Sequence, residues 1–221
     1  MRTVIFDLDG TLVDSAGDLI AAANAAMASL GYPPQLTPGG DDAVAFRGGR
    51  AMLTLGFERL GLAAPKAEID RCYPVLLEAY GTSIDRYTTL YPGAVEAVIR
   101  LQAAGAAVGI CTNKPDHLAE ALLTRLGIRN LFSSMIGAHT LFTRKPDAAP
   151  YLAAVTRAGG HPSRSVLIGD TETDRNTARA AGVPCILVAF GPSGRAVANL
   201  APEALLDHYD DLDRVLANLL P

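Results

Sequence analysis

The chain has 221 residues, of which 49% are hydrophobic and 19% are charged, so it holds enough apolar material for one large core or for a core with a smaller second domain. This composition excludes a disordered chain and a small disulfide-stabilised protein. Because 19 basic residues face 23 acidic ones, for a net charge of -4, and no segment gathers a basic stripe, we expect no nucleic-acid partner.

The amino-terminal segment MRTVIFDLDG turns acidic early, so it lacks the apolar stretch and the cleavage site of a signal peptide. The longest helical run of small apolar residues, Leu19 to Leu30, is shorter than the roughly 20 residues that a membrane-spanning helix needs. Cys72, Cys111 and Cys185 lie in apolar surroundings without the spacing of a zinc site, which predicts reduced thiols. We therefore expect a cytoplasmic protein without a membrane partner.

Short apolar runs alternate with helical patterns over most of the chain, and the helical patterns end at Gly105, Gly127 and Gly182. Ala204 to Leu206 are expected to add an edge strand before a final helix. Strands that alternate with helices predict an α/β fold with a parallel sheet. The other predicted strands are Thr3 to Phe6, Ala107 to Cys111, Ser134 to Gly137, Ser165 to Gly169 and Pro184 to Ala189.

The stretch 13–83 departs from this alternation, since it shows helical periodicity and no convincing strand. We expect it to form an α-helical domain inserted into a core of residues 1–12 and 84–221. A breaker-rich loop, PPQLTPGGDD, and a less regular helical pair around Ala43 and Met52 to Leu60 lie between its two main helices. The apolar faces of those helices are Leu19, Ala22, Ala23, Ala26, Met27 and Leu30, and Ile69, Cys72, Tyr73, Leu76, Leu77 and Tyr80.

Asp7 and Asp9 follow the first predicted strand, and the alternation of strand side chains directs both carboxylates to one side. A solvated strand end would also explain two such acids. Gly10 and Thr11 come next and predict a flexible turn whose amides can approach an anion closely. This setting suits a phosphate and a divalent cation.

Polar residues also follow the later strands. Thr112 and Asn113 end the second strand, where a helix cap is the ordinary alternative. Lys145 follows the third, and a solvated loop lysine is its default interpretation. Asp170 ends the fourth, with Asp174 close behind. Because open α/β sheets bind ligands at the carboxyl ends of their strands, these residues together predict a site for phosphoryl transfer, with a hard cation held by carboxylate oxygens.

Two other function classes compete with this interpretation. A serine hydrolase would need a nucleophile elbow, and the GPSG segment at 191–194 does not fit one, whereas an aspartate nucleophile is ionised without a helper base. A receiver-like phosphoaspartate signalling domain would also collect acids, a threonine and a Lys-Pro pair at strand ends. Receivers, however, carry the phosphorylated acid on the third strand of a much shorter chain.

Four segments resemble, in chain order, the motifs of haloacid dehalogenase-like phosphatases, namely FDLDGTLVDS, CTNKP, RKPDAAP and GDTETD. The resemblance covers nearly the whole chain. It implies a Rossmann-like core with a mobile helical cap, and a magnesium-dependent reaction through an aspartyl-phosphate. Asp7 would be the nucleophile and Asp9 the acid/base, and the acid at position 9 favours a phosphatase over a dehalogenase.

The resemblance also implies roles for the residues at the other strand ends. Thr112, Asn113 and Lys145 would bind the phosphate. Asp170 would bind Mg²⁺ together with Asp7 and the carbonyl of Asp9. Asp174 would support the metal through its water shell.

The implied substrate is a small phosphorylated metabolite. DSAGDLIAAAN and FRGGRAMLTL are similar to phosphoglycolate phosphatases, although Gly17 replaces a frequent proline. Sugar-phosphate mutases, pyrophosphatases, nucleotidases and phosphonate hydrolases share the same plan. Arg47, in the FRGGR turn, is a candidate partner of the substrate's carboxylate, with a solvated loop arginine as the alternative. The sequence leaves a monomer and a homodimer equally open.

Overall fold

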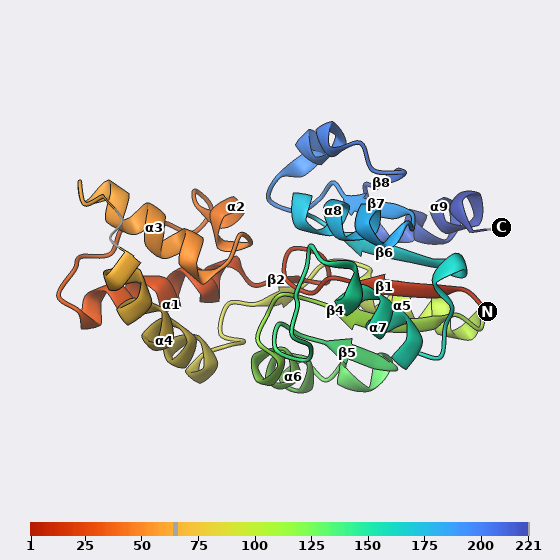
Figure 1. Cartoon of the computed structure of the whole chain (residues 1–221), viewed down its shortest axis with the longest axis horizontal. Helices are drawn as coiled ribbons and strands as arrows, with labels where there is room; N and C mark the ends of the chain where they lie inside the picture. Colours follow the sequence, from red (N-terminus) through yellow and green to blue (C-terminus); the bar gives the residue numbers. More distant parts are fainter. Residues whose placement is uncertain (64–65, 221) are drawn as a thin grey trace. The chain divides into compact units, whose positions relative to one another are not determined.

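The computed structural model describes residues 1–63 and 66–220. The chain divides into two compact units, one of Met1–Asp14 and Leu90–Pro221, here called the core unit, and one of Ser15–Thr89, here called the helical unit. The junctions thus follow Asp14 and Thr89 rather than residues 12 and 83. In the junction segments, β2 (Val13–Asp14), which is labelled in Figure 1, pairs with β3 (Thr89–Leu90) in a two-stranded sheet. The expectation that 13–83 lacks strand was wrong at its start, because two-residue strands are too short to show alternation.

The core unit contains a six-stranded sheet in the order β5-β4-β1-β6-β7-β8, and every adjacent pair in it is parallel. All six predicted strands are present, although β5 and β7 are shorter than expected. Every residue of β1, β4 and β6 is buried, which explains their continuous apolar sequences. The strands are β1 Thr3–Phe6, β4 Ala107–Cys111, β5 Ser134–Ile136, β6 Ser165–Gly169, β7 Cys185–Val188 and β8 Ala204–Leu206.

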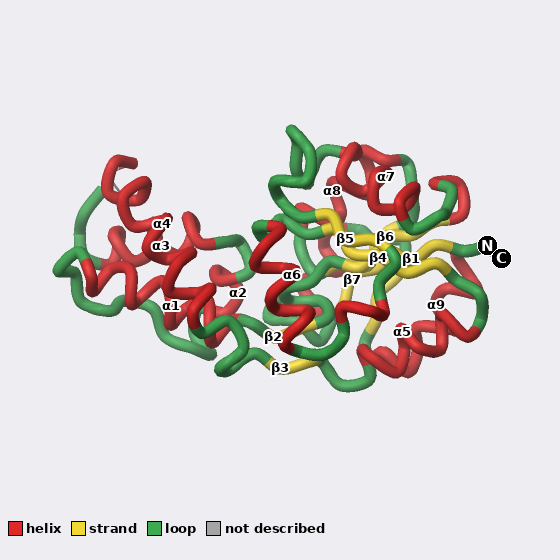
Figure 2. The backbone as a smooth tube through the Cα atoms, turned by 90° about the horizontal axis from the view of Figure 1, so that it is seen from below, coloured by secondary structure: helices red, strands yellow, loops and turns green. Residues whose placement is uncertain are grey.

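Helices cover both faces of this sheet. In Figure 2, α7 and α8 lie on one face and α5 and α9 on the other. The three cysteines are buried and free of disulfides, as predicted. The helices of the core unit are α5 Ala94–Ala103, α6 Asp116–Arg125, α7 Ala148–Arg157, α8 Glu172–Ala181 and α9 Leu212–Leu219, with short 3-10 helices at Arg129–Leu131, Pro162–Arg164, Gly194–Leu200 and Tyr209–Asp211.

The strand order reverses at β1. The chain first adds β4 and β5 on one side of β1, and then adds β6, β7 and β8 on the other. The carboxyl ends of β4, β1 and β6 therefore lie side by side at the point where the connections diverge, which is where open α/β sheets bind ligands. Because helices cover both faces, polar chemistry is directed to this edge.

The helical unit contains α1 (Ala16–Ser29), α2 (Asp42–Ala45), α3 (Gly49–Arg59) and α4 (Lys66–Thr82). As predicted, α1 and α4 bury apolar faces, which include Ile20 and Met27 in α1 and Ile69 and Leu76 in α4. These faces are narrower than expected, since the outer members Leu19, Leu30, Tyr73 and Leu77 are half-buried. Among the described residues, no helix is long and apolar enough to cross a membrane.

Asp18 ties the two ends of the helical unit together. Its Oδ2 accepts hydrogen bonds from the backbone N–H of Tyr87 at 2.9 Å, from that of Thr88 at 2.8 Å and from the Thr88 hydroxyl at 2.7 Å. The Asp18 side chain is buried, so these donors replace the water that the carboxylate loses. The start of α1 and the residues before β3 are thereby fixed to each other.

Replacing Asp18 is expected to destabilise the helical unit. Asp18→Ala leaves three hydrogen-bond donors without their acceptor, two of them buried, so the free energy of unfolding should fall by roughly 2–4 kcal/mol. Denaturant unfolding followed by circular dichroism measures this change. Glu78→Ala, at an exposed position of α4, is the matched control and should stay within about 0.5 kcal/mol of the wild type. Equal stability of the two variants would contradict the role of Asp18.

Candidate active site

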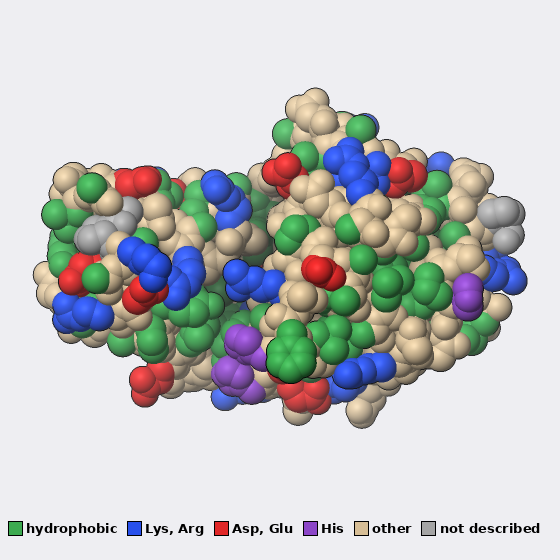
Figure 3. Space-filling view, viewed as in Figure 1, with side chains coloured by type: hydrophobic (Ala, Val, Ile, Leu, Met, Phe, Trp, Pro, Cys, Tyr) green, Lys and Arg blue, Asp and Glu red, His purple; other side chains and the backbone are tan. Residues whose placement is uncertain are grey.

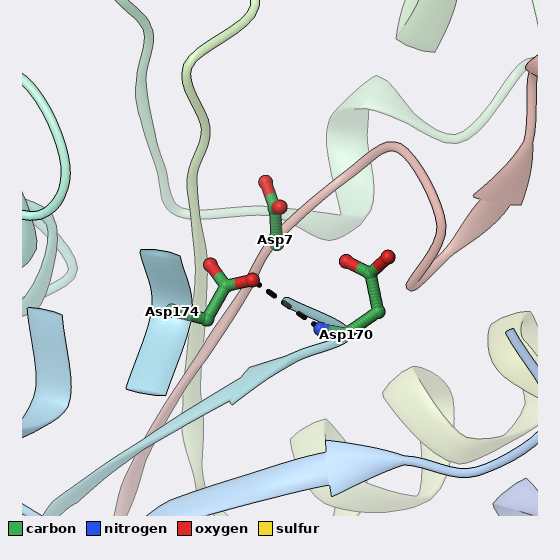
Figure 4. A group of neighbouring side chains, drawn as sticks. All are labelled: Asp7, Asp170 and Asp174. Carbon is green, nitrogen blue, oxygen red and sulfur yellow. Dashed lines mark hydrogen bonds between the residues drawn. The ribbon is translucent and has the colours of Figure 1, made fainter. Parts of the chain in front are cut away.

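Three aspartates meet at the carboxyl edge of the sheet (Figure 4). Asp7 directly follows β1, Asp170 directly follows β6, and Asp174 lies in the first turn of α8. All three are buried, and each offers a carboxylate oxygen that lies within 4.8 Å of the others. The backbone N–H of Asp7 donates to the carbonyl of Ile168 at 2.8 Å, which holds the ends of β1 and β6 in register. The sequence places these acids after strands of one parallel sheet, and the structure brings them together.

Lys145 joins two of these carboxylates. Its Nζ lies 3.0 Å from Oδ1 of Asp7 and 2.6 Å from Oδ1 of Asp174, and its side chain is 2% exposed. The loop that carries Lys145 is held from the end of β4, where the side-chain amide of Asn113 donates to the Lys145 carbonyl at 3.0 Å. The default interpretation of a solvated loop lysine is therefore wrong. A buried ammonium at this position can neutralise negative charge that gathers around Asp7.

Asp174 has both carboxylate oxygens engaged by protein groups. Oδ1 accepts from Lys145, and Oδ2 accepts from the backbone N–H groups of Asp170 and Thr171 at 3.3 and 3.1 Å and from the Thr171 hydroxyl at 2.7 Å. Thr171 and Asp174 also form the capping box of α8. A carboxylate with this many donors is suited to orient its neighbours.

Asp9 is paired with Lys114, a residue to which the sequence analysis gave no role. The Lys114 Nζ lies 2.8 and 3.0 Å from the two carboxylate oxygens of Asp9. Lys114 belongs to the CTNKP segment, and its backbone N–H donates to the hydroxyl of Thr112 at 3.2 Å. A lysine three residues after the end of a central strand was the available sequence signal. The site thus contains a second buried ammonium beside Lys145.

The turn after Asp9 has a different role from the one predicted. The backbone N–H of Gly10 donates to the carbonyl of Val13 at 2.8 Å and that of Thr11 to the carbonyl of Leu8 at 3.3 Å, so both amides serve the turn itself. The expectation that they approach an anion was wrong. Gly10 has a φ of +78°, and a Cβ there would overlap Oδ2 of Asp170. Glycine is required because the turn packs directly against Asp170.

The charges of the site favour a divalent cation. The carboxylates of Asp7, Asp9, Asp170 and Asp174 and the ammonium groups of Lys114 and Lys145 together carry a formal charge of −2. Burial raises the pKa of Asp7 to about 6, with Lys145 opposing the shift and Asp174 adding to it. Burial, together with Asp174 and Asp7, also holds the pKa of Asp170 well above its usual range. The described residues of this cluster are all carboxylates, and oxygen donors of this kind fit a hard cation.

Arg47 lies in the helical unit, in the turn between α2 and α3. Its side chain is exposed, and none of the described residues pairs with it. Arg50, by contrast, forms an ion pair with Asp70 at 2.7 Å and stacks over the ring of Tyr73 at 4.7 Å. The two arginines of the FRGGR segment are therefore not equivalent. On the face seen in Figure 3, basic and acidic side chains are interspersed.

Comparisons with known proteins place this chain in a family. A sequence profile of the haloacid dehalogenase-like hydrolases matches residues 4–188. The chain is 36% identical to a phosphoglycolate phosphatase of Mesorhizobium japonicum, over 98% of this chain and 95% of that protein, and 36% identical to one of Caulobacter vibrioides, over 99% and 92%. A crystal structure of a predicted phosphoglycolate phosphatase from Haemophilus somnus 129PT superposes with a TM-score of 0.81 at 25% identity, covering 97% of both chains.

Removing the charge of Asp7 is expected to stabilise the metal-free protein in a pH-dependent way. Because the folded-state pKa of about 6 lies above the ordinary 3.8, the folded protein binds the proton more tightly, and stability falls as pH rises through this window. Asp7→Asn should therefore unfold at a higher temperature than the wild type at pH 8, by an equivalent of roughly 1–3 kcal/mol, and the gain should shrink toward pH 4. Thermal unfolding in chelator at both pH values measures it. A less stable variant at pH 8 would show that the Lys145 pair outweighs burial.

Proposed function

Because the chain belongs to the haloacid dehalogenase-like hydrolases, we propose that its core unit hydrolyses a small phosphomonoester through a phosphoryl group carried by Asp7. One observation supports this assignment above the others. A buried carboxylate at the end of β1 lies 3.0 Å from a buried ammonium, beside two further aspartates and two residues before Asp9. This arrangement combines a nucleophile, charge compensation and an acid at a single edge of the sheet.

In the first step, a carboxylate oxygen of Asp7 attacks the phosphorus, and the bond from phosphorus to the ester oxygen breaks. Asp9 gives its proton to that oxygen, so the product leaves with a neutral hydroxyl group and not as an alkoxide. Lys145 stays beside the transferred group and offsets its negative charge. Thr112 and Asn113, in the loop after β4, are proposed to bind the phosphoryl oxygens.

In the second step, water attacks the phosphorus of the aspartyl-phosphate, and the bond from phosphorus to the Asp7 oxygen breaks. Asp9, ionised after the first step, accepts the proton of that water. Phosphate leaves, and Asp7 is again a free carboxylate. Two chemically simple displacements thus replace a single difficult one.

We propose that the cation is Mg²⁺, since the available donors are oxygens. Asp7, Asp170 and the carbonyl of Asp9 would hold it, and Asp174 would support it through bound water. Bound there, it would supply positive charge next to the phosphoryl oxygens. Asp174 and Thr11 orient the loop that presents Asp170, because they contact its backbone N–H and its carboxylate at 3.3 Å each.

Phosphoglycolate is the proposed substrate, since the relatives compared above are phosphoglycolate phosphatases that match nearly the whole chain. Arg47 is proposed as a specificity residue for the carboxylate, because its planar guanidinium suits that group and no described residue pairs with it. Lys66, in the same unit, forms an ion pair with Asp70 at 2.7 Å, and its side chain is 88% exposed. We therefore do not propose it as an amine that reacts with the substrate.

Loss of either acid should stop turnover, but in distinguishable ways. Asp7→Asn should lower kcat for every monoester at least about 100-fold, since it removes the nucleophile. Asp9→Asn should lower kcat/KM strongly for an alkyl phosphate and much less for nitrophenyl phosphate, whose leaving group needs no proton. Steady-state phosphate release measures both. Equal loss of kcat/KM on good and poor leaving groups would exclude the acid role of Asp9.

Removal of the metal by a chelator should reversibly abolish catalytic activity. Excess chelator should abolish phosphate release, and added Mg²⁺ should restore it. Ca²⁺ should bind but support little turnover, because its larger and looser coordination lets Asp7 bind through both oxygens and blunts its attack. Full activity in excess chelator would contradict the proposed cation.

A further inference from the structure

Lys114 is a buried cation for which the two steps above have no use. Its side chain is 3% exposed, and its ammonium contacts both carboxylate oxygens of Asp9. The backbone of Lys114 is fixed on both sides, since its N–H donates to Thr112 and its carbonyl accepts from the N–H of Ala138 at 2.9 Å. The ammonium is thus held in the loop that follows β4, in the same unit as Asp7.

The position of Asp9 limits how far this ammonium lies from the substrate. To protonate the ester oxygen, a carboxylate oxygen of Asp9 must come within hydrogen-bonding reach of it, at roughly 2.6–3.2 Å. The Lys114 Nζ lies 2.8 and 3.0 Å from the oxygens of that carboxylate. When the ammonium and the ester oxygen both contact the same oxygen of Asp9, they are therefore at most about 6 Å apart.

A second anionic group on the substrate can contact the Lys114 ammonium only if it lies close to the ester oxygen. In a phosphorylated 2-hydroxy acid, two bonds of about 1.5 Å separate the ester oxygen from the carboxyl carbon. Its carboxylate oxygens can then reach the ammonium while the ester oxygen stays beside Asp9. A sugar monophosphate places only hydroxyls there, and a nucleoside monophosphate carries no second anionic group.

One ammonium can serve two carboxylates in this site, because Lys145 already does so between Asp7 and Asp174. Lysine suits such a bridge, since its compact charge carries three donors that need no planar partner. Burial strengthens the attraction, because little water screens it. We propose that Lys114 is a specificity residue that binds the carboxylate of a phosphorylated 2-hydroxy acid while it holds Asp9.

This inference rests on the proposed phosphomonoester hydrolysis and is tested with two substrates that differ only at the second anion. Phosphoglycolate carries the carboxylate, and ethyl phosphate has a methyl group in its place, while both have poor leaving groups. For Lys114→Met, the ratio of kcat/KM for phosphoglycolate to that for ethyl phosphate should fall roughly 10- to 100-fold, as expected for a lost charged hydrogen bond. Lys114→Arg should restore part of the ratio, since it keeps the charge.

The alternatives give different patterns. If Lys114 acts only by positioning Asp9, both substrates lose equally and the ratio stays unchanged, which overturns the proposal. An unchanged ratio without loss on either substrate overturns it too. Thermal unfolding of Lys114→Met and Lys114→Arg verifies that both variants are folded, and a ratio that Lys114→Arg fails to raise above that of Lys114→Met also contradicts it. Failure of the proposed function looks different, because the wild type would then release phosphate from neither substrate.

Discussion

The ammonium of Lys145, fixed between Asp7 and Asp174, is the interaction on which the site depends. It connects the loop after β5 with the end of β1 and with the first turn of α8. Because all three side chains are buried, removing Lys145 would leave two carboxylates uncompensated in a medium that solvates them poorly. Lys145 therefore determines where the carboxylates of Asp7 and Asp174 lie at the carboxyl edge of the sheet.

Placing these aspartates together in a buried site lowers the stability of the folded chain. Burial raises the pKa of Asp7 and of Asp170, which means that the folded chain prefers these groups uncharged. Both lysines offset part of the repulsion, and a hard cation would offset the remainder. A site that is unfavourable when empty and favourable when occupied is the usual signature of function built at the expense of stability.

The sequence was sufficient for features that follow from local pattern. Apolar runs that end in acids identified β1 and β6, and the parallel arrangement then required Asp7 and Asp170 to meet. Contacts between distant segments carry no such pattern. The pair of Lys114 with Asp9 joins residues 105 positions apart, and that of Asp18 with Thr88 joins residues 70 apart. Each looks like an ordinary polar residue until the fold places its partner, and the requirement for Gly10 likewise appears only once Asp170 is beside it.

The hydrogen bonds of Asp18 have a consequence for how such proteins diversify. They join the start of α1 to the residues just before β3, so the helical unit is closed on itself at its own base. An insert whose entry and exit are held together makes small demands on the domain that hosts it, which is why insertions with adjacent ends are well tolerated. Substitutions and length changes in loops of the helical unit far from its two ends then leave the strand register of the core unit unchanged. Selection can then vary the insert over an unchanged catalytic sheet.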